Sequence, residues 1–208
     1  MRSLRIFALG ASTLVAASLG AQTPETAPQV HITPYAGYMM FGDYLKGPFG
    51  TTLTNSPGLV YGTQLDLPLS KNISLVGNLG YTSTDFQIGV PFFGGFSAGH
   101  SQMYIYDADL EYNFGQTKTS SLAFSPFVQA GVGAMHYNID ADILSTTATN
   151  LAGNVGVGAD FTVGRGIALR LMAKDYIGQF NFEDATGLGL TGQTANNFAL
   201  TAGLKFDF

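Results

Sequence analysis

The C-terminal segment, residues 197–208, alternates without a break between two kinds of side chain. Apolar residues occupy one set of alternate positions, namely Phe198, Leu200, Ala202, Leu204, Phe206 and Phe208. The other set is small or polar: Asn197, Ala199, Thr201, Gly203, Lys205 and Asp207. Because successive side chains in a strand point to opposite faces of the sheet, this pattern predicts a β-strand with one apolar face and one wet face.

A row of acids in residues 104–114 indicates what the two faces meet. Asp107, Asp109 and Glu111 lie on one face of this predicted strand. The other face is apolar and aromatic, with Tyr104, Tyr106, Ala108, Leu110, Tyr112 and Phe114. Three acids at every second position do not suit the core of a soluble sheet. They suit a hydrated lumen, with the opposite face against lipid and tyrosines at both of its ends.

Six further segments alternate in the same way, at about 30–41, 59–68, 72–81, 122–137, 150–163 and 167–177. Asp175 interrupts the apolar face of the last of these, which a bulge or a position near the lipid headgroups would accommodate. Charged residues are only 11% of the chain, against about a quarter in soluble domains. We therefore predict an all-β fold, an eight-stranded antiparallel transmembrane barrel. Ten strands remain an alternative if a long loop contains a hairpin.

The predicted connections alternate in length. Short links at 70–72 and 164–166 and a moderate one at 115–121 alternate with longer ones at 42–58, 82–101, 138–149 and 178–196. This rhythm is typical of a barrel with periplasmic turns and external loops. The apolar stretch Ile88–Ala98 could contact lipopolysaccharide, bind a partner or fold over the barrel mouth. We favour a simpler reading, in which its aromatic residues continue the outer girdle on strands that extend past the membrane.

The N-terminus has the pattern of an export signal. Arg2 and Arg5 precede the uncharged run Ile6–Leu19, and small residues follow. The run is shorter than the roughly 20 residues of a membrane helix, so a secretory signal peptide over residues 1–21 is favoured over an anchor. Residues 22–29 are then a short lead-in and residues 30–208 the barrel. Export and barrel together predict the bacterial outer membrane.

These segments together resemble the small eight-stranded outer-membrane barrels of the OmpA, OmpX and opacity-protein kind. In that family the barrel assembly machinery reads a terminal aromatic residue, and the resemblance gives this role to Phe208 with Leu204 and Phe206. Phe208 could instead simply sit at the membrane interface. The implied partners are outer-membrane lipid, lipopolysaccharide, the assembly machinery and a surface ligand of the long loops. An acidic chain, with net charge −5, is not expected to bind nucleic acid.

The predicted lumen is rich in charge. Its inward residues include Asp66, Asp107, Asp109, Glu111, Asp160, Arg170, Lys174, Lys205 and Asp207. Side chains fill the interior of an eight-stranded barrel, and buried charges need partners. We expect Asp160 to pair with its neighbours Arg170, Lys174 or Lys205, and the acids of residues 104–114 to pair with the same bases across the lumen. This predicts a salt-bridged plug. A narrow cation-preferring pore is the alternative, because acids outnumber bases.

Enzyme chemistry finds little support. The histidines are His31, His100 and His136, and none has a serine placed as a lipid A deacylase would require. Asp140 and Asp142 near His136 are only weakly similar to the paired Asp and His groups of an omptin-like protease, or to a calcium site. Acids in such positions are more often solvated loop residues. With no Cys and no phosphate-binding motif, we predict no catalytic residue, cofactor or metal. The favoured function is a structural or surface-interaction barrel; a small diffusion pore and a lipid-modifying enzyme are the alternatives.

Overall fold

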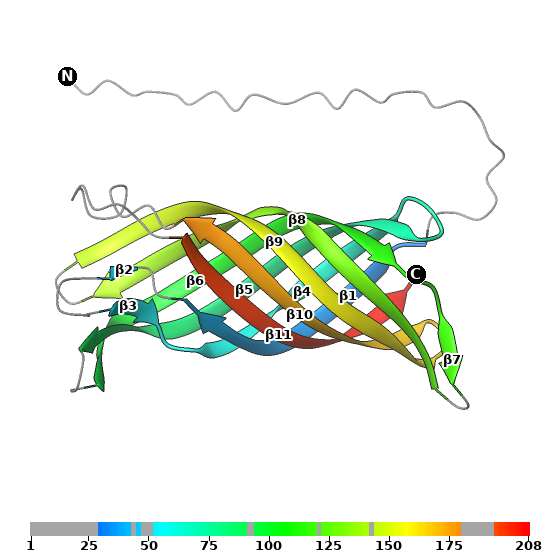
Figure 1. The fold of residues 1–208 in the computed structure, drawn as a ribbon, viewed down its shortest axis with the longest axis horizontal. Coiled ribbons are helices and arrows are strands. Elements are labelled where there is room, and N and C mark those ends of the chain that lie inside the picture. The colour runs from blue at the N-terminus through cyan, green and yellow to red at the C-terminus, as the bar shows by residue number, and fades with distance from the viewer. Residues whose placement is uncertain are drawn as a thin grey trace, which may run out of the picture.

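The computed structural model forms a closed barrel of eight antiparallel strands (Figure 1). It describes residues 29–42, 45–46, 52–90, 94–119, 122–141, 144–179 and 194–208. The eight strands are β1 (His31–Phe41), β4 (Gly58–Pro68), β5 (Ile73–Val90), β6 (Gly94–Asn113), β8 (Leu122–Ala141), β9 (Leu144–Gly164), β10 (Ile167–Gln179) and β11 (Thr194–Asp207). Among the described residues there is no helix, and so none that could span a membrane. The predicted signal peptide and residues 22–28 of the lead-in lie outside this description.

The ring closes because β1 pairs with both β11 and β4, while β5 pairs with β6. The predicted all-β, eight-stranded fold is confirmed. Three short strands, β2 (Leu45–Lys46), β3 (Thr52–Asn55) and β7 (Thr117–Thr119), stay outside the ring. The small β2–β3 hairpin pairs only with β5 at Thr52–Asn55, beyond the start of β4. The ten-stranded alternative is therefore wrong, because this hairpin adds to one strand without entering the ring.

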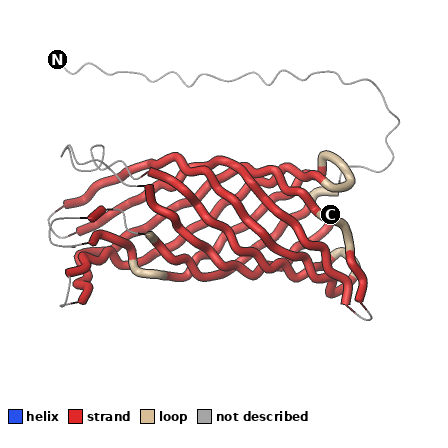
Figure 2. The backbone as a smooth tube through the Cα atoms, in the orientation of Figure 1, coloured by secondary structure: helices blue, strands red, loops and turns tan. Residues whose placement is uncertain are grey.

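Four strands run much farther than predicted. Residues 82–90 and 94–101 belong to β5 and β6, and residues 138–141 and 144–149 belong to β8 and β9 (Figure 2). The prediction of long loops over 82–101 and 138–149 was wrong. Alternation fades where both faces of a strand carry polar side chains, such as Thr82 and Ser83, whereas the backbone pairing continues through these residues. Of the apolar stretch Ile88–Ala98, the parts outside residues 91–93 are strand; its side chains lie outside the description.

Each strand has one exposed and one enclosed face. Large apolar residues such as Leu59, Leu79, Val132 and Leu151 are exposed on the outside, as a wall facing lipid requires. Asp175 also points outward. Its register with Val155 and Phe198 is continuous, so the bulge suggested for this position is wrong. The carboxylate instead accepts a hydrogen bond of 3.3 Å from the side-chain amide of Asn196 on β11.

Glycines on the inner face make room for large lumen side chains. The ring of Tyr35 lies over Gly62 and Gly80, where an added Cβ would come within 2.6 and 2.7 Å of its hydroxyl. Phe127 covers Gly158 in the same manner. A barrel this narrow has room for inward aromatic side chains only where the facing residue is a glycine and has no side chain. At these positions the glycines therefore let the Tyr35 and Phe127 rings enter the lumen.

The two ends of the barrel are named here by their connections. At the loop end, residues 42–57 join β1 to β4 and residues 180–193 join β10 to β11. At the turn end lie the tight connections at residues 69–72 and 165–166 and the C-terminus. Gly166 has a φ of 67°, a left-handed conformation that favours glycine in the turn between β9 and β10.

Candidate functional site

The centre of the first lumen cluster is Arg170 on β10. Its Nε lies 2.7 Å from Oδ1 of Asp160 on β9, and its Nη1 lies 3.0 Å from Oε2 of Glu111 on β6. Asp66 on β4 is 3.5 Å from the same Nη1. The guanidinium also lies over the ring of Phe127, 4.3 Å from its centroid. One planar cation thus joins carboxylates from three strands, a use for which the forked guanidinium is suited.

Lys205 on β11 completes this cluster toward the turn end. Its Nζ lies 3.1 Å from Oδ2 of Asp66 and 3.2 Å from Oδ2 of Asp160. The Lys205 side chain keeps 13% of its surface exposed, whereas those of Arg170 and Asp66 are fully enclosed. The arginine cluster, as we call Asp66, Glu111, Asp160, Arg170 and Lys205, is therefore most exposed at Lys205 and Asp160.

Lys174 follows Arg170 by four residues on β10, on the side away from the turn end, and is the centre of a second cluster. Its Nζ lies 2.6 Å from Oδ1 of Asp107 and 2.5 Å from Oδ2 of Asp109. Asn78 on β5 donates to the other oxygen of Asp107 at 2.8 Å. Nζ also lies 5.2 Å from the ring of Tyr176. The lysine cluster, Asp107, Asp109 and Lys174 with Asn78, is buried throughout.

The structure brings eight of the nine charged lumen residues of the sequence analysis into these two clusters. The acids of β6 divide between them, because Glu111 pairs with Arg170 while Asp107 and Asp109 pair with Lys174. Asp207 joins neither. It lies at the turn-end mouth, where its carboxylate is 2.7 Å from Nδ1 of His31 on β1. In both clusters the carboxylates outnumber the bases, so the lumen is electronegative.

An apolar cluster fills the lumen toward the loop end, and the sequence analysis missed it. Its members come from seven strands of the ring: Met39, Val60, Met103, Ile105, Met135, Tyr137, Ala152, Tyr176 and Ala199. Tyr35 and Phe41 pack against it. The available signal was the inward parity of residues 30–41 and 122–137, which carries Met39, Met135 and Tyr137 in place of polar residues. Lumen chemistry therefore changes along the barrel axis.

No protein-family model matches this sequence, and no curated protein matches it. The fold does match solved structures. Neisserial surface protein A is 14% identical, with a TM-score of 0.60 over 86% of this chain and 97% of that chain. Pseudomonas aeruginosa OprG is 13% identical, with a TM-score of 0.58 over 88% and 96%. The N-terminal barrel domain of P. aeruginosa OprF is 15% identical, with a TM-score of 0.54 over 87% and 98%.

The chain has the fold of the small eight-stranded outer-membrane β-barrels. The resemblance seen in the sequence is thereby confirmed as a likeness of fold. Function has to be argued from the residues of this outer-membrane-type barrel, because one fold hosts many functions.

The histidines of this outer-membrane-type barrel are dispersed. His31 faces inward at the turn end, and His136 faces outward on β8, where its Nδ1 lies 2.7 Å from Oγ1 of Thr149. The side chains of His100 and Asp140, and the whole of Asp142, lie outside the description. Among the described residues, no group of three or more His, Asp or Glu side chains is arranged to hold a metal ion.

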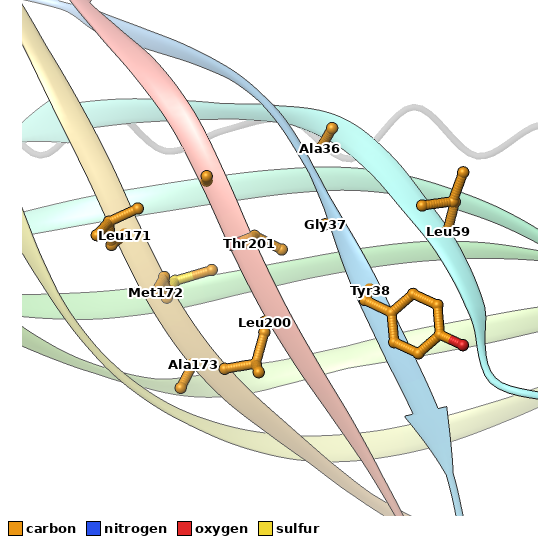
Figure 3. A pocket seen from close by; sticks show the side chains of 10 residues that line it. Ala36, Gly37, Tyr38, Leu59, Leu171, Met172, Ala173, Leu200 and Thr201 are labelled. Atoms are coloured by element: carbon orange, nitrogen blue, oxygen red, sulfur yellow. The ribbon is translucent and has the colours of Figure 1, made fainter.

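The outer wall of this outer-membrane-type barrel carries a shallow apolar hollow of about 710 Å³ between β1, β10 and β11 (Figure 3). Small residues form its floor, among them Ala36 and Gly37, while Tyr38, Leu171 and Leu200 form its sides. It lies within the apolar band of the wall, and its lining carries no ionisable group other than the Tyr38 phenol. This composition suits contact with lipid rather than chemistry.

Proposed function

We propose that the chain is a non-enzymatic barrel of the bacterial outer membrane, exported through residues 1–21, whose lumen is closed. Its role is structural or in surface interaction, with the β5–β6 and β8–β9 hairpins as the elements it presents outside the membrane. The observation that carries the proposal is the stacking of three side-chain clusters along one narrow lumen. The arginine and lysine clusters fill the part toward the turn end, and the apolar cluster fills the part toward the loop end.

The two kinds of cluster resist ions for different reasons. An ion that enters from the turn end must displace Arg170 or Lys174 from carboxylates that are themselves buried. Separating such pairs costs several kcal/mol. An ion that enters from the loop end must shed water in a stretch lined largely by methionines and tyrosines, with Asn150 and Asn197 as buried polar neighbours. Both barriers lie in series, so either alone keeps the barrel silent.

Conductance in a planar bilayer tests the proposal. Mature protein, residues 22–208, is refolded and inserted, and its folded state is checked by the shift in gel mobility between heated and unheated samples. We expect no stable current steps. Repeated, stable steps from the unmodified barrel would overturn the closed lumen.

The second candidate is a narrow cation-preferring pore, supported by the excess of carboxylates over bases in both clusters. This candidate requires stable current steps, with a reversal potential in a salt gradient that shows a preference for cations. Asp107→Asn and Asp109→Asn should then reduce that preference, because both residues face the lumen. A preference that does not change would argue against this route.

Leu204, Phe206 and Phe208 are proposed as the signal for the barrel assembly machinery. In support, β11 is the strand whose pairing with β1 closes the ring, and the amide of Phe208 donates to the carbonyl of Val30 at 3.0 Å. Leu204 points out from the wall and is half exposed. Deleting Phe208 should reduce assembly in cells while unassisted refolding in detergent stays unchanged. Equal loss in both assays would assign Phe208 a purely structural role.

A further inference from the structure

Three rows of side chains cross the outer wall of β5, β6, β8 and β9 in strict register. The lowest row is apolar, with Leu79, Tyr106, Ala134 and Leu151. The next row toward the loop end is aromatic, with Tyr81, Tyr104, His136 and then Thr149. The third row is polar, with Ser83, Gln102, Asn138 and Thr147. Within a few ångströms the wall thus passes from hydrocarbon-like to hydroxyl and amide chemistry.

The aromatic row is continuous. The ring centroids of Tyr61 and Tyr81 are 5.3 Å apart, those of Tyr81 and Tyr104 are 5.0 Å apart, and Tyr104 lies 6.5 Å from the ring of His136. The hydrogen bond to Thr149 fixes His136 at the end of the row. Girdle aromatics occur on many barrels, and here they form one unbroken panel of rings, each tilted by 43–57° to its neighbour.

The polar row lies directly above this panel and carries no formal charge. Ser83 and Thr147 are exposed, and Gln102 and Asn138 are half buried along the same wall. On β5 the row begins at Ser83, directly after Thr82, which pairs with Val60 of β4. The strands β5, β6, β8 and β9 all continue beyond this row toward the loop end. The four paired strands therefore hold hydroxyls and amides directly beside the aromatic row.

An apolar hollow of about 540 Å³ lies directly below the panel, between β6, β8 and β9. Small residues open it, because Gly133, Ala134 and Gly153 lie between Tyr106 and Leu151. The hollow on the other side of the barrel (Figure 3) has a different surrounding. Its neighbourhood on β10 includes the outward carboxylate of Asp175, and among the described residues Tyr38 has no continuous row of rings beside it.

We propose that this face of β5, β6, β8 and β9 binds a glycolipid of the surrounding leaflet. An acyl chain occupies the hollow, a sugar ring stacks on the Tyr81–Tyr104–His136 panel, and its hydroxyls pair with the polar row. The C–H groups on one face of a sugar are attracted to the electron-rich face of an aromatic ring. The absence of Lys and Arg from all three rows favours a sugar over a phosphate headgroup. The inference rests on the membrane placement of the proposed function and not on the closed lumen.

The experiment measures which lipid stays with the barrel. The refolded mature chain is placed in phosphatidylcholine nanodiscs that contain equal small fractions of glucosyl diacylglycerol and phosphatidylglycerol with identical acyl chains. Lipids retained after mild detergent extraction are counted by native mass spectrometry. We expect about tenfold enrichment of the glucosyl lipid over phosphatidylglycerol, the effect of one or two hydrogen bonds and a stacked ring.

The variant Tyr104→Leu with Gln102→Leu should abolish this enrichment. Tyr112→Leu is the matched control, because Tyr104 and Tyr112 lie on the same face of β6 and are equally exposed, at 45%. Tyr112 sits at the turn end and should be dispensable. Asn138→Leu, a single change on β8, provides a second variant should the double variant fail to refold.

Three results would overturn the proposal. They are no enrichment by the folded unmodified barrel, undiminished enrichment in the Tyr104→Leu/Gln102→Leu or Asn138→Leu variants, and preferential retention of phosphatidylglycerol. The readout is independent of conductance. A barrel that conducts and still retains the glucosyl lipid would overturn the closed lumen and support the glycolipid site.

Discussion

The two halves of the lumen are filled by opposite means. Toward the turn end the arginine and lysine clusters join carboxylates and bases from β4, β6, β9, β10 and β11 at 2.5 to 3.5 Å. Toward the loop end the apolar cluster fills the lumen with methionine, tyrosine and aliphatic side chains. Ion pairs are directional and fix which strand faces which across the lumen, whereas methionines fill whatever volume remains.

This difference makes the charged half intolerant of losing one partner and the apolar half sensitive to volume. Removing one partner of a buried ion pair leaves an uncompensated buried charge, which is strongly destabilising. A truncated methionine leaves a cavity whose cost depends on how far its neighbours relax. The boundary between the halves lies where Lys174 approaches Tyr176.

The largest effect is expected at the centre of the arginine cluster. Arg170→Met leaves Asp66, Glu111 and Asp160 buried with only Lys205 among them. The free energy of unfolding in lipid vesicles should fall by about 3–5 kcal/mol. Urea titration followed by tyrosine fluorescence measures it, since the chain has 10 Tyr and no Trp.

Arg165→Met is the control for that change, because Arg165 is exposed in the turn between β9 and β10. Its stability should be close to that of the unmodified barrel. The Arg170→Met barrel should remain electrically silent, because the apolar cluster is intact. Large stable currents from it would show that the apolar half is no barrier.

The apolar half should respond to lost volume. Met135 is buried, and its sulfur accepts hydrogen bonds from Tyr137 and Asn197, each at 3.6 Å. Met135→Ala should lower the free energy of unfolding by about 2–4 kcal/mol. Met40→Ala, on the outer face of β1 and 40% exposed, should cost clearly less. Equal losses in the same urea titration would mean that a lipid-facing methionine and a methionine of the lumen contribute equally to the free energy of unfolding.

The lysine cluster offers a test of pairing against packing. Lys174→Met leaves Asp107 and Asp109 buried side by side without their base. Adding Asp109→Leu removes one of the stranded charges, so the double variant should be more stable than Lys174→Met alone by about 1–3 kcal/mol. A complete cycle of the two single variants and the double variant measures the coupling free energy between Lys174 and Asp109. Simple additivity would show that Lys174 and Asp109 do not act as a pair.

The strands and their faces could be read from the sequence because lipid and lumen impose opposite demands on alternate residues. Residues 104–114 show this, with Asp107 between the outward Tyr106 and Ala108. The extensions of β5, β6, β8 and β9 could not be predicted from the sequence, because both faces of the strands are polar where Ser83 and Thr147 lie. The apolar cluster escaped notice because Met39 and Met135 weaken the contrast between faces.

The charged residues of the lumen were predictable, but their assignment to two clusters was not. Sequence alone left Arg170, Lys174 and Lys205 as interchangeable partners for the acids. Which base reaches which acid depends on the stagger of strands around the ring, a property of closure that no single segment contains. The choice of Lys174 for Asp107 and Asp109 follows from that stagger.

The smallest expected effect concerns the glycines that admit lumen aromatics. Gly62→Ala places a Cβ against the Tyr35 ring and the carbonyl of Leu79, so both the ring and the backbone at Leu79 must shift and the free energy of unfolding should fall by about 1–3 kcal/mol. Gly77→Ala on the outer face meets nothing within 4 Å. It should be neutral or slightly stabilising in the same urea titration, because alanine restricts the unfolded chain. If both substitutions behave alike, the inner wall around Tyr35 is packed no more tightly than the outer surface.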